Sequence, residues 1–387
     1  MKRWTVRGIA WLAGMSLSLG VWMIPDAAQA DIAPFRGKRK RRPTYAKNWT
    51  PTQIPASKRS IMYGTPQDKL WKPVCTGGRR VTRKCRDKQH YVTTNEFHHE
   101  LFYPYLKNRA GAYAGVGTDQ NFTFIAWARS RVAFLMDYDP VVVRVNLAHQ
   151  AFILKSPNRR AYLRYWRPRY KKRGAKLLRK FYKNHPEREG IVEAYFFARK
   201  TVNFHYHIIR KRRFGWNYHR MRPAPKRRNL RDKRDFNWMH KESNYQYIRK
   251  MFQTGRIRIM KGDLLGSKSL RGIGNACRKL GVSLRLLYMS NAEEFWKYPT
   301  NFRKNITNLP MDSKSLIIRT RFTSKYGSRL DAWIYILHKG KHFQKMVKKS
   351  SVQKVDHSMK PLKKVVRGLF TVKVPLPKGA MRHLRTP

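Results

Sequence analysis

Acidic residues are scarce in this sequence, yet several of them stand where stretches with the pattern of buried β-strands end. Asp137 and Asp139 close the stretch RVAFLMDYDP, and Asp263 closes GRIRIMKGD. Two further acids, Glu293 and Glu294, follow VSLRLLYMSN. Ligands of open α/β sheets bind in a crevice at the carboxyl ends of the strands, so these carboxylates are placed to bind ligand hydroxyl groups. The other interpretation is that they cap helices or neutralise nearby arginines.

A glycine-containing turn, GVGTDQN at 115–121, precedes the first of these acids. Gly115 and Gly117 let a ligand approach the backbone closely, and the helix N-terminus behind the turn presents unpaired N–H groups and a positive dipole end. The motif does not complete GxGxxG, because Gln120 or Asn121 stands where the third glycine would fall. Spacing alone leaves two interpretations open, a nucleotide-binding turn and a plain connection from a strand to a helix.

Alternating strands and helices must position these motifs. The pattern predicts a strand over 111–117, a helix over 118–130, a strand over 131–139 and a helix that begins at Pro140. The alternation returns after residue 255, with strands and helices predicted over 255–263, 264–281, 282–291, 292–310, 314–322 and 330–340. Repeated strand–helix units of this kind predict a Rossmann-like α/β fold with an open sheet.

Composition divides the chain into four parts. Residues 1–30 have a basic start, an apolar run broken by Pro25 and the small-x-small pattern Ala28-Gln29-Ala30. These features together predict a signal peptide that is cleaved after Ala30, and therefore a periplasmic or secreted protein. An uncleaved anchor is the alternative, and no later segment is apolar enough to span a membrane. The other parts are a basic, Pro-rich linker over 31–70 with order from about Trp71, an α/β domain over 71–338 with a basic helical insertion at about 155–250, and a basic C-terminal tail over 339–387.

The charge of the chain is extreme. It has 86 Lys and Arg against 21 Asp and Glu, a formal net charge of +65. Such a protein repels itself and is expected to function beside polyanions. In a bacterial envelope these are lipopolysaccharide, anionic lipids, teichoic-type polymers or nucleic acid. Adaptation to an acidic medium is the other explanation. The basic insertion interleaves aromatic residues with Arg, which suits sequence-independent nucleic-acid binding, but no known base-reading motif is present.

The motifs TTNE (93–96), GVGTDQN, MDYDP, GDLLG and YMSNAEE together resemble an uncharacterised family of bacterial proteins that look like S-adenosylmethionine-dependent methyltransferases in fold. The resemblance covers roughly Thr93–Phe322 and implies a methyltransferase-like open sheet. By this resemblance the amino-acid end of the cofactor lies at Gly115, Gly117, Asp119, Gln120 and Asn121, its ribose at Asp137 and its adenine near Asp263. Ser290, Asn291 and Glu293 are then the candidates for the reacting centre.

Two functions follow from these observations. The first is an exported cationic protein that keeps the fold without the reaction and binds anionic envelope polymers or lipids. The second is a group-transfer enzyme that uses S-adenosylmethionine or another nucleotide cofactor, for which an exported protein has no evident supply. The predicted export favours the first function, because fold alone does not dictate activity.

The remaining reactive residue types give little chemistry. Cys75 and Cys85 flank a turn-like Thr-Gly-Gly, so a local disulfide is predicted, whereas Cys277 lies in the apolar stripe of a predicted helix and is expected to be a buried thiol. The run His98-His99-Glu100 does not match HExxH, and the sequence has no CxxC spacing. No metal site is predicted.

Overall fold

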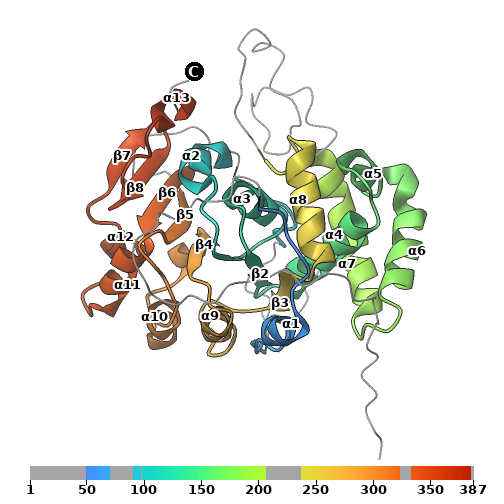
Figure 1. Ribbon diagram of the computed structural model, residues 1–387, viewed down its shortest axis with the longest axis horizontal. Coiled ribbons are helices and arrows are strands. Elements are labelled where there is room, and N and C mark those ends of the chain that lie inside the picture. Colours follow the sequence, from blue (N-terminus) through green and yellow to red (C-terminus); the bar gives the residue numbers. More distant parts are fainter. Residues whose placement is uncertain (1–48, 70–89, 97, 206–236, 323–332, 385–387) are drawn as a thin grey trace, which may run out of the picture. The chain divides into compact units, whose positions relative to one another are not determined.

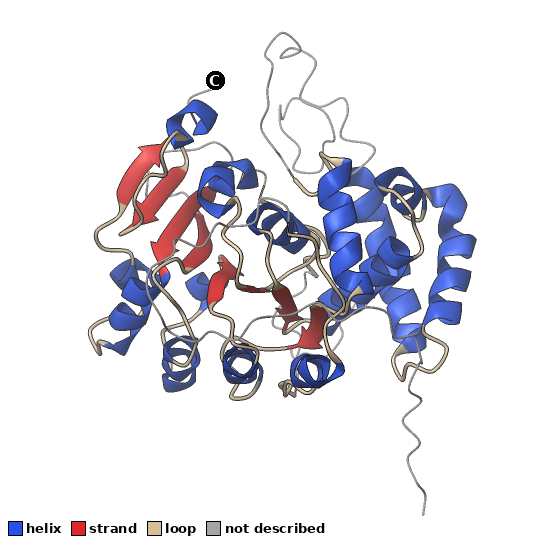
Figure 2. Ribbon diagram, in the orientation of Figure 1, coloured by secondary structure: helices blue, strands red, loops and turns tan. Residues whose placement is uncertain are grey.

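The structure is a computed structural model that describes residues 49–69, 90–96, 98–205, 237–322 and 333–384. Within these residues an eight-stranded sheet runs in the order β3-β2-β1-β4-β5-β6-β8-β7 (Figures 1 and 2). The strands are β1 (Ala112–Gly115), β2 (Val132–Asp137), β3 (Ile257–Lys261), β4 (Leu284–Ser290), β5 (Leu316–Phe322), β6 (Trp333–Lys339), β7 (Lys363–Val366) and β8 (Leu369–Val372).

The first five strands form a parallel block, and the chain reverses its direction of travel across the sheet beside β1. It passes from β1 outward to β2 and β3, then returns to place β4 and β5 on the other side of β1. Strand β6 runs antiparallel to β5. This is a doubly wound arrangement, which confirms the predicted Rossmann-like α/β fold, and its ligand crevice is expected where the order reverses, at the carboxyl ends of β1 and β4.

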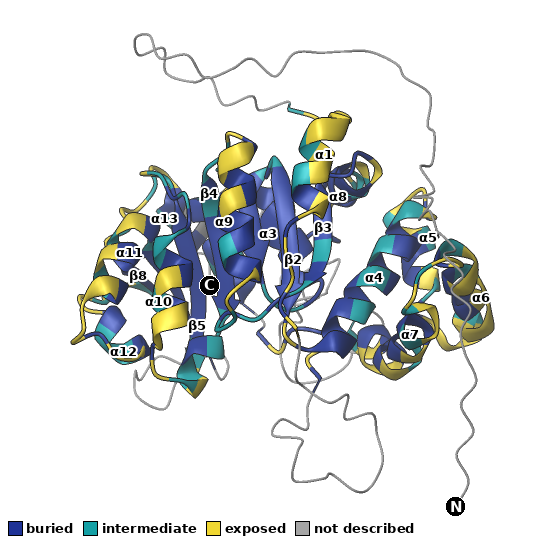
Figure 3. Ribbon diagram, turned by 90° about the horizontal axis from the view of Figure 1, so that it is seen from below, coloured by how far each residue is buried: buried dark blue, intermediate teal, exposed yellow. Residues whose placement is uncertain are grey.

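Helices cover both faces of the sheet (Figures 1 and 3), which is why β1 and β2 read as continuous apolar runs and are buried at every residue. Helices α1, α9, α10 and α11 pack on one face and α2, α3, α4 and α8 on the other. The helices are α1 (Ala56–Tyr63), α2 (Tyr103–Leu106), α3 (Gln120–Ala128), α4 (Pro140–Leu154), α5 (Arg159–Arg164), α6 (Lys171–Phe181), α7 (Arg188–Asn203), α8 (Glu242–Gln253), α9 (Ser269–Lys279), α10 (Thr300–Thr307), α11 (Gly340–Lys348), α12 (Val355–Ser358) and α13 (Ala380–Leu384), with 3₁₀ turns η1 (His99–Phe102), η2 (Pro168–Tyr170) and η5 (Ala292–Phe295).

The start of α4 shows how local sequence sets an element. Pro140 occupies the first turn, where its missing N–H costs nothing, and Asp139 Oδ1 accepts the backbone N–H of Val141 at 2.9 Å as the N-cap. The helix therefore begins where the sequence predicts. The same observation gives Asp139 the role of a helix cap, one of the two roles considered for the strand-end acids.

The basic block after α4 is helical in its described part. Helix α7 packs against α4, and α6 packs against α7. An aromatic core joins them, in which Phe152 and Tyr165 stack with ring centroids 4.7 Å apart and Trp166 is completely buried. The aromatic residues of this core thus point inward, and the Lys and Arg residues of α6 are left on the outside.

The C-terminal stretch is part of the sheet, so the prediction of a basic tail over 339–387 is corrected. Strand β8 pairs in parallel with β6 and antiparallel with β7. Phe370 and Val372 pack with Ile334 and Ile336 in a small apolar cluster. The high density of lysine hid the alternating apolar residues that hold these strands.

The segment before residue 70 is also folded, which corrects the predicted onset of order near Trp71. Helix α1 packs against α9, and its Met62 is completely buried. Beyond it the Asp68 carboxylate accepts backbone N–H groups at 3.1, 2.9 and 3.2 Å, those of Asp263, Lys268 and Ser269. The chain thus supplies its own anion to the N-terminus of α9.

We expect Asp68→Ala to destabilise the protein by about 1–2 kcal/mol, the usual cost of losing a helix-capping acceptor. Residues 49–69 should also exchange amide hydrogens faster, because one of their attachments to α9 is gone. Denaturant unfolding and hydrogen exchange measure the two effects, and Asp68→Asn, which keeps an acceptor oxygen, should cost less. Unchanged stability and exchange in Asp68→Ala would contradict this role.

Candidate functional site

The parallel strands bring most of the predicted site residues to one edge of the sheet. Gly115 ends β1, Asp137 ends β2 and Ser290 ends β4, while Asp263 lies two residues beyond the end of β3. Ser290 has a positive φ of 52° at an irregularity in the β4–β5 pairing. A left-handed non-glycine residue is a strained conformation of the kind that clusters at functional sites.

The glycine turn after β1 is packed by the protein's own side chains. A Cβ atom at Gly115 would collide with Asn121 Oδ1 and with the Tyr113 hydroxyl, and those two groups are hydrogen-bonded to each other at 2.5 Å. Asn121 Nδ2 also donates to the carbonyls of Val116 and Thr118, at 3.0 and 2.7 Å. The requirement for glycine at 115 is therefore already explained by internal packing.

Gly117 and the residues after it follow the same pattern. Gly117 has a φ of +88°, and a Cβ there would collide with the Gln120 amide. The Gln120 side chain folds back on the turn, accepting from the Thr118 N–H at 3.1 Å and donating to the Val116 carbonyl at 3.3 Å. Asp119, Gln120 and Asn121 are all buried. Their binding of a cofactor stays a prediction, and it would require these side chains to move.

Asp137 links the ends of the first two strands. Its Oδ2 accepts the Gly117 N–H at 2.8 Å, and its Oδ1 accepts the Asp139 N–H at 2.8 Å. Asn146, on α4, donates from Nδ2 to the Gly117 carbonyl at 2.8 Å. The carboxylate thus shapes the glycine turn directly, and its binding of a ribose stays a prediction.

Asp263 lies in the turn before α9. Its Oδ1 accepts the Leu265 N–H at 2.8 Å. Burial raises the pKa of Asp263 and the charge of Asp68 adds to the rise, while the Leu265 N–H opposes it. The structure therefore gives Asp263 a role in its own loop, and contact with an adenine ring stays a prediction.

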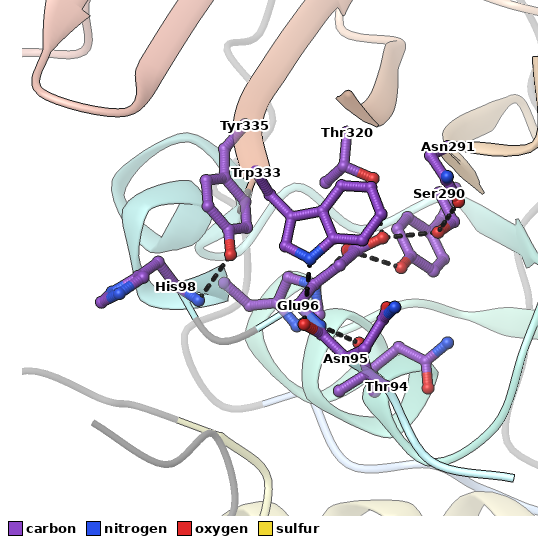
Figure 4. A network of polar contacts seen from close by, with 12 residues as sticks. Thr94, Asn95, Glu96, His98, Ser290, Asn291, Thr320, Trp333 and Tyr335 are labelled. Carbon is purple, nitrogen blue, oxygen red and sulfur yellow. Dashed lines mark hydrogen bonds and ion pairs between the residues drawn. The ribbon is translucent and has the colours of Figure 1, made fainter. Parts of the chain in front are cut away.

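The centre of the carboxyl edge is Glu96, a residue of the TTNE motif to which the sequence assigned no role (Figure 4). Its side chain is buried and accepts four hydrogen bonds. The donors come from η1, β4 and β5, and they are His99 Nε2 at 2.6 Å, Tyr288 OH at 2.9 Å, Ser290 Oγ at 2.5 Å and Thr320 Oγ1 at 2.6 Å. One carboxylate therefore holds together segments that are about 200 residues apart in the sequence.

The surroundings of Glu96 favour its ionised form. Burial alone would raise its pKa, but the hydrogen bond and charge of His99, with the hydrogen bonds of Ser290 and Thr320, outweigh burial and lower it. Burial and the Glu96 charge raise the pKa of Tyr288, so that phenol stays a donor. The network is thus a buried anion with matched donors.

The chain beside Glu96 is attached to β6. The Trp333 indole N–H donates to the Asn95 carbonyl at 3.0 Å, and the His98 N–H donates to the Tyr335 hydroxyl at 2.9 Å (Figure 4). These contacts attach Asn95 and His98 to the start of β6, beside the Glu96 network. One signal in the sequence could have pointed to this arrangement: Glu96 is an acid in a chain with few acids, inside the TTNE motif.

The predicted reacting-centre residues have different environments. Ser290 donates to Glu96, and Asn291 Nδ2 donates to Glu294 at 3.1 Å. Glu293 is buried in an ion pair with Arg319, with Oε2 2.6 Å from Arg319 Nε. A buried pair of this kind is a structural element that is costly to break. Glu293 therefore lies apart from the Glu96 network, and a catalytic role for the three residues stays a prediction.

The cysteines divide between described and undescribed parts of the chain. Cys277 is a buried free thiol, as predicted, and burial raises its pKa to about 12. Cys75 and Cys85 lie outside the described residues. In the described ranges no group of three or more His, Cys, Asp or Glu is arranged to hold a metal ion. None of the described helices combines the length and the apolar character needed to cross a bilayer.

Comparison with known proteins gives one family and a distant structural likeness. A family model described as Domain of unknown function (DUF7790) matches residues 91–373. Two solved structures of the rRNA methyltransferase aviRa from Streptomyces viridochromogenes are similar at 11% identity. One match covers 57% of this chain and 71% of that chain with a TM-score of 0.24, and the other covers 60% and 75% with a TM-score of 0.25. A search of curated proteins gives no match.

We expect Glu96→Gln to lower the free energy of unfolding by roughly 2–4 kcal/mol at neutral pH, because buried donors lose a charged acceptor. The pKa of Glu96 is lowered on folding from an ordinary value of 4.5, so its contribution is present above that pH and is lost as the pH falls through the folded-state value. The difference between wild type and variant should therefore shrink on acidification.

Denaturant unfolding of both proteins between about pH 7 and pH 3 measures this effect. Glu193→Gln is the matched control, since Glu193 is exposed on α7. A cost for Glu96→Gln that is independent of pH would mean that the carboxylate charge is not what stabilises the network.

Proposed function

The chain belongs to the family described as Domain of unknown function (DUF7790), and we propose that it is a cationic protein that binds anionic polymers or lipids through its helical layer. We assign this binding to a surface that we call the basic face. It consists of the exposed Lys and Arg residues in the segment 155–186, which contains α5, η2 and α6. The observation that carries the proposal is the charge of this segment.

The segment 155–186 has no Asp or Glu. Its cations are held on folded helices, because α6 buries Gly174, Ala175 and Leu178 and leaves its basic residues outside (Figure 3). The exposed members of the basic face are Lys155, Arg160, Arg164, Arg167, Arg169, Lys171, Lys172, Arg173, Lys176, Arg179, Lys180 and Lys183. A rigid array of this kind attracts a polyanion without first having to be ordered.

The acids at the start of neighbouring α7, Glu189 and the N-cap Glu187, neutralise little of this charge. Glu189 pairs with Arg179 at 3.0 Å and with Arg188 at 2.9 Å. Glu187 pairs with Arg144 at 2.9 Å and with Lys261, and neither cation belongs to the basic face. Most of the basic face is therefore left for an external anion.

The leader supports a location for this binding. Residues 1–48 lie outside the described residues, so export after cleavage at Ala30 is a proposal that the leader sequence supports. In the periplasm or outside the cell, the available anions are lipopolysaccharide phosphates, anionic lipids, teichoic-type polymers and nucleic acid. All of them offer closely spaced negative groups to the basic face.

We expect the wild-type protein to bind heparin with an affinity that falls steeply between about 50 and 200 mM salt, because binding releases condensed counterions. The triple variant Lys172→Gln, Lys176→Gln, Lys180→Gln should show weaker binding and a shallower dependence on salt. The control triple Lys304→Gln, Lys341→Gln, Lys354→Gln removes the same charge from exposed positions outside the basic face.

Dissociation constants of the wild type and both triple variants, measured at several salt concentrations, test whether the basic face carries the binding. Equal losses in the two triples would mean that net charge, and not the basic face, carries the binding. An affinity of the wild type that does not change with salt would exclude counterion release altogether.

A second candidate function is group transfer with S-adenosylmethionine or another nucleotide cofactor. The doubly wound order and the Asp137 carboxylate at the edge beside β1 support it. Asn146 Oδ1 adds to this support, because it is buried close to the glycine turn without a hydrogen-bond partner in the described part of the chain. The side chains of Gln120 and Asn121, which fill the turn, favour the binding function over this one.

Calorimetric titration with S-adenosylmethionine separates the two functions. We expect no binding in the micromolar range, because Gln120 and Asn121 occupy the turn that the ligand would need. Micromolar binding that is lost in Asp137→Asn would instead favour the group-transfer function.

A further inference from the structure

The most exposed large apolar side chain of the described residues lies at the carboxyl edge of the sheet. Phe295, the last residue of η5, is 76% exposed. It stands five residues beyond Ser290, where β4 ends. An aromatic ring that a fold leaves in water at the ligand-binding edge of a parallel sheet is a surface available for stacking.

A lysine follows Phe295 closely in the chain. Only Trp296, which is extended with φ −148° and ψ 158°, separates Phe295 from Lys297, and both of these side chains are exposed. Trp296 itself is partly buried and packs edge-on against Phe302, with ring centroids 6.2 Å apart. The aromatic ring and the ammonium group therefore flank an anchored residue.

Lys297 lines an open pocket of about 480 Å³ that contains further cations. The pocket lies between the start of α10 and the turn after α11, and no acid lines it. Its lining residues are Lys297, Tyr298, Arg303, Lys348, Ser350 and Gln353. Phosphate-sized anions are attracted to such a group of cations, since there is no internal carboxylate to compete for them.

Arg303 makes this pocket rigid. Its guanidinium donates to the carbonyl of Val347 at 2.6 Å, to that of Lys349 at 2.8 Å and to that of Val352 at 2.6 Å. These bonds hold the turn after α11 against α10 and keep Lys348 at the pocket. The N–H groups of Arg303 are engaged in these hydrogen bonds, but its positive charge remains in the pocket. Lys297 and Lys348 are exposed and able to contact a ligand.

We propose that this pocket and Phe295 bind a nucleotide unit of a single-stranded polynucleotide, with the phosphate at Lys297 and Lys348 and the base stacked on Phe295. The proposal rests on the polyanion-binding function and names the class of polymer. Stacking on an exposed ring beside a cationic groove is the general mode of sequence-independent single-strand binding. A polymer without planar bases would offer Phe295 no π-stacking partner. A lipid surface would meet exposed polar neighbours, Lys297, Thr300 and Asn301, beside a single apolar side chain.

The test compares a fluorescently labelled oligo(dT) of eight nucleotides with heparin, which carries charge but no planar bases. Phe295→Ala should weaken oligo(dT) binding about fivefold to 150-fold, the range typical of losing one base–aromatic stack, and leave heparin affinity unchanged. Phe295→Trp should retain the affinity for oligo(dT). Because Phe295 is mostly exposed, these variants should keep the wild-type melting temperature.

The lysines are tested by the double variant Lys297→Ala, Lys348→Ala against the control Lys304→Ala, Lys341→Ala, which removes exposed charges of α10 and α11 outside the pocket. Only the pocket variant should lose substantial affinity for oligo(dT). Equal losses in the two doubles would overturn the assignment of the phosphate to the pocket.

Two other outcomes separate this inference from the function on which it rests. Heparin binding with no effect of Phe295→Ala on oligo(dT) binding would overturn the nucleotide site and leave the polyanion function standing. Failure of the wild type to bind either ligand would overturn both. Phosphatidylglycerol vesicles that bind through Phe295, with no binding of oligo(dT), would assign the surface to lipid instead.

Discussion

The carboxylate of Glu96 is the group on which the arrangement of the sheet edge depends. An ionised carboxylate taken out of water is strongly destabilising unless hydrogen-bond donors replace its hydration. Here four donors do so, and they come from η1, β4 and β5. Because no single segment could supply all of them, the ends of β4 and β5 must be in place together with Glu96 and His99. The left-handed Ser290 belongs to the same set, since its hydroxyl reaches Glu96 from that conformation.

Elsewhere along this edge the protein satisfies its own binding groups in the same way. Asn121 and Gln120 fill the glycine turn, Asp137 accepts the Gly117 N–H, and Asp68 takes the place of an anion at the start of α9. Each of these positions is one where an open α/β fold ordinarily receives a ligand. Gln120 and Asn121 fill the glycine turn with the protein's own side chains. This filling supports our proposal that the protein binds its ligand on the outer surface.

The distribution of charge gives the surface its character. The fully buried Arg319 has an acid partner in Glu293, whereas the buried Arg256 and Arg258 donate to backbone carbonyls. On the basic face the acids are missing, and near Phe295 the pocket lining is again free of them. With 86 basic and 21 acidic residues in the chain, most basic residues cannot each have an acid of their own, and the basic face keeps part of this excess at the surface. That excess is the basis of the proposed attraction for polyanions, and the helices and the exposed ring of Phe295 are the proposed contact points.

The sequence by itself determined the features that depend on neighbouring residues. The alternation of strands and helices, the start of α4 at Pro140, the burial of Cys277 and the doubly wound fold class all follow from local periodicity and capping. Only the tertiary structure decided that Asp68 caps α9, that residues 363–372 extend the sheet and that Glu96 is its central anion. Thr320, which donates to Glu96, lies 224 residues further along the chain. A hydrogen bond over that separation leaves no periodic trace in the sequence, because the partners are chosen by the packing of whole strands and not by their neighbours.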